Sequence, residues 1–288
     1  WEKATLMIIV KQFGSRFFHR TELNQAAVKL LSGVELEAGL MNLRRKGIVY
    51  AFYRSWQEEV FIIPLDALKL WLMLLFPMLI DLDSIESAVK QTEVITTHGC
   101  GRGIAFDLFF LLVYCDQNKI SLTRKGTISK RDVIQIYKHA QIQSKLLNTL
   151  VCLQKNGKLN LLSDPPELEF ILTLAFKLEL LCITSNVQHI EICYKRLKQW
   201  LALENCQINN CLYTLIKGIY ELPIEGMNHC LAKLESIPLN KWECIENITY
   251  WLVNYDIINK SAVESLYLAL ESWVKFMNSL GWLELGRS

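Results

Sequence analysis

The pattern of apolar and polar positions over Thr5–Pro64 predicts three helices followed by a two-stranded hairpin. Apolar residues dominate 48–53 and 59–63, on either side of Arg54–Glu58, which favours two strands joined by a turn. Helix, helix, helix and hairpin is the order of the winged-helix variant of helix-turn-helix proteins. The predicted helices, each with apolar residues every three or four positions, are Thr5–Phe13, Thr21–Leu30 and Glu35–Lys46.

A second pattern recurs at three predicted helix ends. An apolar residue lies four positions before a glycine, and residues with the alternation of an extended strand follow the glycine. The three stretches are Leu43–Val49, Leu153–Leu159 and Met277–Leu283. Glycine tolerates the positive φ that ends many helices, so each stretch predicts a helix that turns directly into a strand. The pattern favours two or three winged-helix-like units, although any helix-to-strand junction can produce it.

We therefore predict a mainly α fold with short β-hairpins, built from tandem winged-helix units and a helical C-terminal region. Breaker residues over Asp81–Gly103 suggest a boundary. The expected domains are a winged helix with a closing helix at 1–82, a second winged-helix-like domain at 103–163, and a helical domain at 164–288 that ends in a third such unit. Within the second, Ser129 is expected to cap a helix over Lys130–Ala140, with a strand at 158–162.

The composition allows a large core but limits the charge. Apolar residues make up 51% of the 288 positions, and 31 basic against 29 acidic residues give a formal charge of +2. A nearly neutral chain needs local clustering to present a basic surface to nucleic acid. The nine cysteines lie scattered, mostly in apolar runs, and no signal peptide is recognised, so we expect free thiols in a reducing cytoplasm and no membrane partner.

Catalytic motifs are missing from the sequence, so we expect no enzyme and no cofactor. Neither a G-x-x-x-x-G-K-S/T phosphate loop nor a G-x-S-x-G nucleophile motif occurs, and the glycine-rich stretch His98–Gly103 is expected to be a linker. His189 and Cys193, expected one helical turn apart, come nearest to metal spacing with Cys206 and Cys211. They lack the C-x-x-C arrangement of zinc sites, so we predict no metal.

Two basic clusters remain as candidates for phosphate contact. The first is Arg44, Arg45 and Lys46 with Arg54 on the hairpin; the second is Arg124, Lys125, Lys130 and Arg131 around the cap at Ser129. Backbone N–H groups at a helix start can bind a phosphate that flanking cations attract. The alternative for both clusters is an ordinary solvated helix end.

The third predicted helix has acidic residues where DNA readers contact base edges. Glu35 and Glu37 lie in its first half, and phosphates would repel them. We therefore expect any DNA binding to tolerate sequence changes. A winged helix that binds protein fits equally well, and Trp56 at the predicted hairpin tip is an anchor for either kind of partner.

Three stretches resemble the N-terminal region of bacterial helicase-associated proteins that carry an XPB/Ssl2-like N-terminal helicase domain. They are Leu40–Gly47 with Ile63–Asp66, then Leu122–Asp132, which is the most specific, and Trp273–Gly286. The resemblance covers nearly the whole chain through loose motifs. It implies a link to DNA repair or transcription and to a helicase partner, but it carries over no functional residue.

The sequence thus predicts a non-catalytic DNA-binding or helicase-accessory module. The first alternative is a protein-interaction scaffold, which the nearly neutral charge favours. A second is a small-molecule sensor with a cavity among the helices of Glu167–Leu285.

Overall fold

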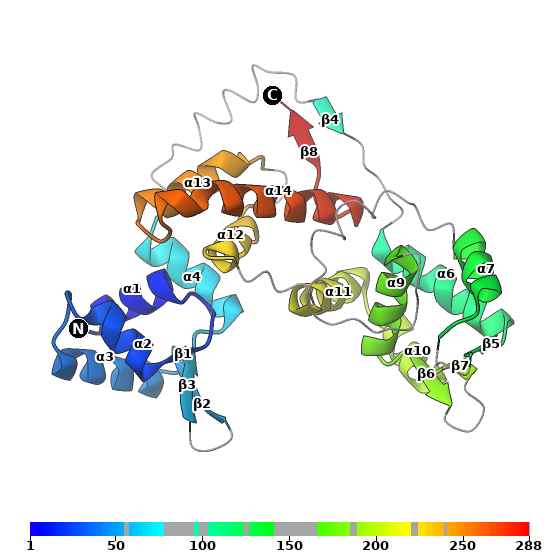
Figure 1. Ribbon diagram of the computed structural model, residues 1–288, viewed down its shortest axis with the longest axis horizontal. Coiled ribbons are helices and arrows are strands. Elements are labelled where there is room, and N and C mark those ends of the chain that lie inside the picture. The colour runs from blue at the N-terminus through cyan, green and yellow to red at the C-terminus, as the bar shows by residue number, and fades with distance from the viewer. Residues whose placement is uncertain are drawn as a thin grey trace. The chain divides into compact units, whose positions relative to one another are not determined.

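The computed structural model is mainly helical, with short antiparallel strands between the helices (Figure 1), which confirms the general fold class. It describes residues 1–54, 58–77, 95–97, 103–123, 127–140, 166–184, 189–219, 224–238 and 241–287. Among these residues, no helix has both the length and the apolar character needed to cross a membrane.

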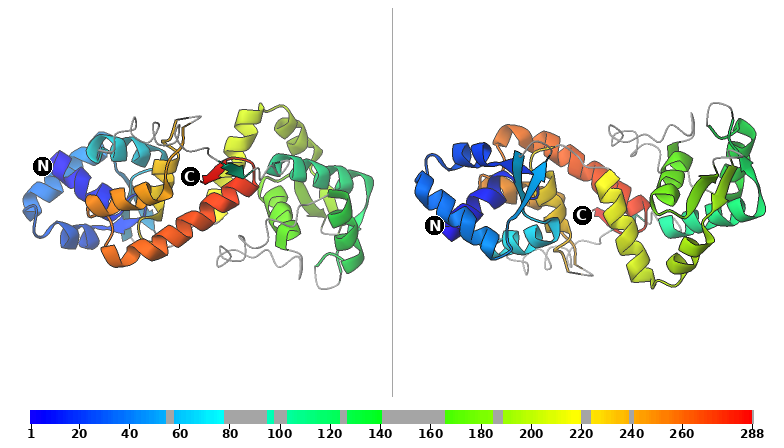
Figure 2. Two further views of the ribbon diagram at one scale, coloured as in Figure 1. Left: turned by 90° about the horizontal axis from the view of Figure 1, so that it is seen from above. Right: turned by 90° about the horizontal axis from the view of Figure 1, so that it is seen from below.

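The chain divides into two compact units, each assembled from separate stretches. Unit 1 contains Trp1–Glu93, Pro223–Glu271 and Ser288, and unit 2 contains Val94–Leu222 and Ser272–Arg287. These units cut across the predicted ranges 1–82, 103–163 and 164–288, which stay predictions. The division falls within α14 (Val263–Ser279), one unbroken helix (Figure 2).

Unit 1 begins with the predicted three helices and hairpin. Its elements are α1 (Glu2–Gln12), β1 (Phe18–His19), α2 (Arg20–Ala27), α3 (Gly33–Arg45), β2 (Tyr50–Arg54) and β3 (Glu58–Ile62). The three strands form an antiparallel sheet in the order β1-β3-β2. β1 is the one element that the hydrophobic pattern did not predict.

Local sequence signals explain where α3 begins, crosses α1 and ends. Ser32 and Glu35 form a capping box at its start, as Ser-x-x-Glu sequences do. Gly39 lies where α3 crosses α1 so closely that a Cβ would stand 2.2 Å from the Thr5 hydroxyl oxygen, so the crossing leaves no room for a side chain there. At the end, Gly47 has φ +69°, and the Ile48 N–H donates to the Leu43 carbonyl at 2.9 Å.

The rest of unit 1 comes from two separate stretches of the sequence. The helix α4 (Leu65–Leu75) packs against α1, as predicted, and also against α12 (Met227–Leu234), which contacts α13 (Ile245–Asn254). The Trp251 Nε1–H donates to the Phe76 carbonyl at 3.0 Å. A short 3-10 helix, Lys260–Ala262, precedes α14.

Among its described residues, unit 2 repeats the element order that runs from α1 to β3 in unit 1. The repeated elements are α6 (Ile104–Gln117), β5 (Ile120–Ser121), α7 (Lys130–Ala140), α9 (Pro166–Lys177), β6 (Leu181–Thr184) and β7 (His189–Ile192). Their strands form a second antiparallel sheet in the order β5-β7-β6. In both three-stranded sheets, the strand that follows the first helix pairs with the last strand of the sheet. The remaining elements are α10 (Tyr194–Leu201), α11 (Asn205–Ile219), and β4 (Ile95–Thr97) paired with β8 (Leu285–Arg287).

Several predicted elements of the second half need correction. The helix expected to contain both His189 and Cys193 is wrong, because β7 occupies His189–Ile192 and α10 starts at Tyr194. Residues 189–192 alternate between polar and apolar side chains, which is a strand pattern, and β7 pairs with β6 at Leu181–Thr184. After the predicted glycine turn at Gly281, φ +79°, β8 pairs with β4 rather than within a hairpin. The predicted strand at 158–162 lies outside the described residues.

Candidate nucleic-acid interface

Ion pairs within unit 1 involve two of the four residues of the first basic cluster. The Arg44 guanidinium lies 3.1 Å from a Glu59 carboxylate oxygen and 5.5 Å from the centre of the Phe61 ring. Lys46 pairs with Glu2. Arg45 is exposed and forms no salt bridge within the described part of the chain. The cluster therefore presents less positive charge than its sequence suggests.

Carboxylates occupy the start of α3, as predicted. The Ser32 hydroxyl and N–H donate to Glu35 at 2.7 and 3.0 Å, and these hydrogen bonds lower the pKa of Glu35, so its carboxylate stays charged. Glu37 pairs with Arg20 at 3.3 Å. An acidic helix start opposes the approach of phosphates, which disfavours α3 as a reader of the major groove.

The β2–β3 hairpin contributes aromatic rather than basic surface among its described residues. Arg54 ends β2 opposite Glu58, and Trp56 lies outside the described residues. Phe52 and Tyr53 are 51% and 73% exposed, and the edge of the Phe52 ring meets Phe17 at 6.2 Å between centroids. Sequence reasoning did not single out these two aromatics, which belong to the apolar run 48–53.

The second cluster lies at the start of α7, where the predicted cap is confirmed. The Asp132 N–H donates to the Ser129 hydroxyl at 3.1 Å, and that hydroxyl donates to the Asp132 carboxylate at 2.8 Å. Lys130 and Arg131 are exposed, and neither forms a salt bridge with a residue that the structure describes. Arg124 and Lys125 lie outside the described residues.

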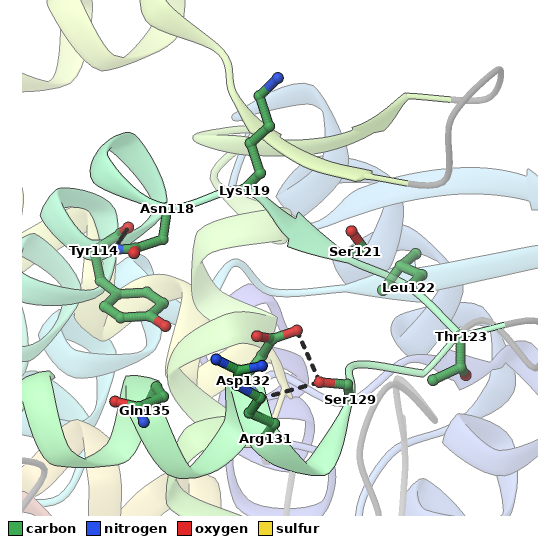
Figure 3. Close-up of a pocket in the computed structure, with 10 residues that line it drawn as sticks. All are labelled: Tyr114, Asn118, Lys119, Ser121, Leu122, Thr123, Ser129, Arg131, Asp132 and Gln135. Atoms are coloured by element: carbon green, nitrogen blue, oxygen red, sulfur yellow. Dashed lines mark hydrogen bonds between the residues drawn. The ribbon is translucent and has the colours of Figure 1, made fainter.

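An open depression of about 580 Å³ adjoins this helix start (Figure 3). The end of α6, β5 and the first turns of α7 line it, and its polar side chains include hydroxyls, cations and one carboxylate. Its lining residues are Tyr114, Asn118, Lys119, Ser121, Leu122, Thr123, Ser129, Arg131, Asp132 and Gln135. Figure 3 shows Lys119 extending away from Arg131, so the two cations lie on different parts of the rim of the depression.

The depression has the chemistry of a phosphate contact. Burial, and secondarily the charge of Asp132, raise the pKa of Tyr114, so its hydroxyl remains protonated and can donate. Ser121 and Thr123 supply further hydroxyls, and Arg131 supplies a guanidinium. These groups can donate hydrogen bonds to phosphate oxygens, and contacts to phosphate carry no information about the base sequence.

The helix after the second hairpin adds basic residues that sequence reasoning missed. Lys195 and Lys198 of α10 are exposed, whereas Arg196 pairs with Glu179 at 2.7 Å. The Tyr194 hydroxyl donates to Asp116 at 2.6 Å, which places the start of α10 beside the end of α6. The run Tyr-Lys-Arg-Leu-Lys at 194–198 is the sequence signal for this basic surface.

Charge separates strongly between the two units. Unit 1 carries 14 basic and 18 acidic residues, a formal charge of −4, and unit 2 carries 17 basic and 11 acidic residues, a formal charge of +6. The near-neutral total of +2 is the sum of these opposite values.

The residues nearest to metal spacing do not form a metal centre. His189 lies in β7 and Cys193 follows that strand, so the premise that one helical turn separates them is wrong. Among the described residues, no three His, Cys, Asp or Glu side chains gather closely enough to hold a metal ion.

Comparison with family models, curated proteins and solved structures finds no match to this chain, so the resemblance to helicase-associated proteins stays a prediction.

Proposed function

We propose that this chain is a non-catalytic nucleic-acid-binding accessory module whose unit 2 contacts the phosphate backbone. The observation that carries the proposal is the charge separation, with +6 on unit 2 against −4 on unit 1. A positive body attracts DNA by releasing its condensed counterions, whatever the base sequence. The start of α7 and its depression are the proposed point of contact.

We further propose that both repeated groups are winged helices. Each has a helix, a short strand, two described helices and a hairpin, and the two sheets share one strand order. This supports the tandem arrangement at 2–62 and 104–192, with the second hairpin later in the chain than the sequence predicted.

Neither third helix suits base reading, which favours sequence-tolerant binding. The face that α3 would offer begins with Glu35 and Glu37. In α9, every side chain from Phe170 to Ala175 is buried. Phosphate contacts are therefore the proposed source of affinity, and the resemblance to helicase-associated proteins suggests repair or transcription as the setting. The cytoplasmic location stays a prediction.

Fluorescence anisotropy with a labelled DNA duplex at two salt concentrations tests the proposal. Replacing Arg124, Lys125, Lys130 and Arg131 by alanine should weaken binding and reduce the slope of log K against log salt by about 0.9 for each phosphate that is no longer neutralised. The matched control replaces Lys3 and Lys29, exposed lysines of unit 1 that form no salt bridge with described residues.

The control should bind like the unaltered protein. If the four substitutions leave the affinity for DNA unchanged, the proposed contact site is wrong. If the unaltered protein does not bind DNA, or binds it without dependence on salt, the proposed function is wrong.

A protein-interaction scaffold is the second candidate, and the exposed apolar surface of unit 1 favours it. Val34 and Met41 of α3 are 81% and 61% exposed, although both are large apolar side chains. Unit 1 can serve this role while unit 2 binds nucleic acid.

A further inference from the structure

The exposed face of α3 forms a narrow stripe along the whole helix. Val34, Ala38, Met41 and Arg45 follow at intervals of four, three and four residues, which places them on one side of an α-helix. Ala38 is half-buried and the other three are exposed. The opposite side of α3 packs against α1 and α2.

The equivalent face in unit 2 is covered. Gly47 and Glu179 occupy the same place, a positive-φ residue between the third helix and its hairpin, with φ +69° and +58°. Counting back from it, Phe170 matches Ala38 and Thr173 matches Met41. Phe170 and Thr173 are 2% and 7% exposed.

Helix α14 provides part of that cover in unit 2, because the ring of its Phe276 lies 5.7 Å from the Phe170 ring, centroid to centroid. The α9 helix packs against α6, the counterpart of α1, and additionally against α11. α11 presents buried Leu212 and Ile216, one turn apart, among mostly uncharged residues. The fold therefore accepts another helix along this face, and the exposed stripe of α3 is a place for one.

Charges beside the stripe fit a second α3 running in the opposite direction. Glu37 and Arg44 lie on the same flank of the stripe, seven residues apart, with Glu37 in the first half of α3 and Arg44 in its last turn. Each also pairs at the edge of this flank within its own chain, Glu37 with Arg20 and Arg44 with Glu59. In an antiparallel pair, each Glu37 faces Arg44 of the partner subunit. The small Ala38 then lies opposite the partner's Met41, so large and small side chains alternate across the contact.

We propose that the α3 face binds a second copy of this chain, forming a two-fold symmetric dimer through antiparallel α3 helices. A two-fold contact uses the same surface on both copies and therefore requires this kind of self-complementarity. The proposal is independent of nucleic-acid binding, because it concerns unit 1 alone. One helix per copy makes a small interface, so the dimer is weak and depends on concentration.

Sedimentation velocity of the full chain over a wide range of concentration tests the dimer. The unaltered protein should shift from monomer to dimer as concentration rises. Met41→Glu should raise the dissociation constant at least about tenfold, because it places a carboxylate at the centre of the contact. Tyr250→Glu is the matched control, since Tyr250 in α13 is also 61% exposed and belongs to unit 1.

A charge exchange distinguishes a dimer contact from a folding defect. Glu37→Arg should weaken the dimer, and Glu37→Arg with Arg44→Glu should restore it, because the cross-subunit pairs reform with reversed polarity. Thermal melting checks that each variant folds, since both residues also pair within the chain. A protein that stays monomeric at every concentration, equal effects of Met41→Glu and Tyr250→Glu, or a double variant no better than Glu37→Arg would overturn the proposal.

Discussion

Units 1 and 2 share an order of helices and strands but differ in charge and in what covers the third helix. Unit 1 is acidic and leaves a stripe of α3 exposed, whereas unit 2 is basic and buries α9. The same order of elements thus leaves different surfaces exposed in the two units. In unit 1 the free face is an apolar helix, and in unit 2 it is a basic helix start.

The two basic clusters also differ in whether carboxylates lie beside their cations. Arg44 and Lys46 have carboxylates beside them, while Lys130 and Arg131 have no salt bridge among the described residues. A run of basic letters therefore predicts a binding surface only when the fold brings no acid to it.

The largest expected difference between the units concerns burial of the third helix. Phe170→Ala should lower the free energy of unfolding by about 3–5 kcal/mol, because it leaves a cavity in the core of unit 2. Met41→Ala should change it by less than about 0.5 kcal/mol, since Met41 is exposed. Denaturant unfolding measures both, and similar losses would show that the two faces are not differently covered.

The crossing of the first and third helices gives the next largest effect. Gly39→Ala should destabilise unit 1 by about 1–3 kcal/mol, because its Cβ would stand 2.2 Å from the Thr5 hydroxyl oxygen. In α9 the matching position is Ile171, which is fully buried, so that crossing accepts a large side chain. Gly33→Ala is the control, since nothing lies within 4 Å of its added Cβ; equal melting curves for the two variants would contradict the close crossing.

The smallest effect concerns acid sensitivity of unit 1. His229 is buried, and its Nε2 lies 2.7 Å from the Val10 carbonyl oxygen. Burial lowers the pKa of His229 below that of the unfolded chain, so the folded state binds fewer protons. Its contribution to stability is therefore present above the unfolded pKa, near 6.5, and is lost as pH falls below it.

The loss should reach at most about 1.4 kcal/mol for each pH unit below that value. Denaturant unfolding at pH 7.5 and in mild acid measures it, with His229→Gln as the comparison. The variant should lose most of the dependence on pH; an unchanged dependence would assign it to other groups.

Sequence patterns predicted the elements with strong local signals and missed those that depend on tertiary context. The helix ends at Gly47 and Gly281 followed from glycine. Glu179 and Asp256 end helices in the same positive-φ conformation and were missed, because a search for glycine overlooks them. Glu179 is held from outside the helix, by Arg196 of α10, and no local pattern reveals such a partner.

The candidate site shows the same division. Ser129 and the start of α7 were predicted in place, because an N-cap is a local signal. The neutralisation of Arg44 by Glu59 depends on pairing the third helix with the hairpin, fifteen residues along the chain, and was not predicted. β8 pairs with β4 and not within a hairpin, and this pairing depends on contact between distant parts of the sequence.

The assembly of unit 1 from two distant stretches has a consequence for synthesis. Leu72 of α4 and Phe76, which follows α4, are buried in the folded chain. Trp251 and Tyr255, which contact Phe76, belong to the second stretch. A ribosome needs on the order of ten seconds to add the intervening Val94–Leu222. During that interval the apolar surface of the first stretch stays uncovered. This stretch therefore completes its packing only after the second stretch has been added.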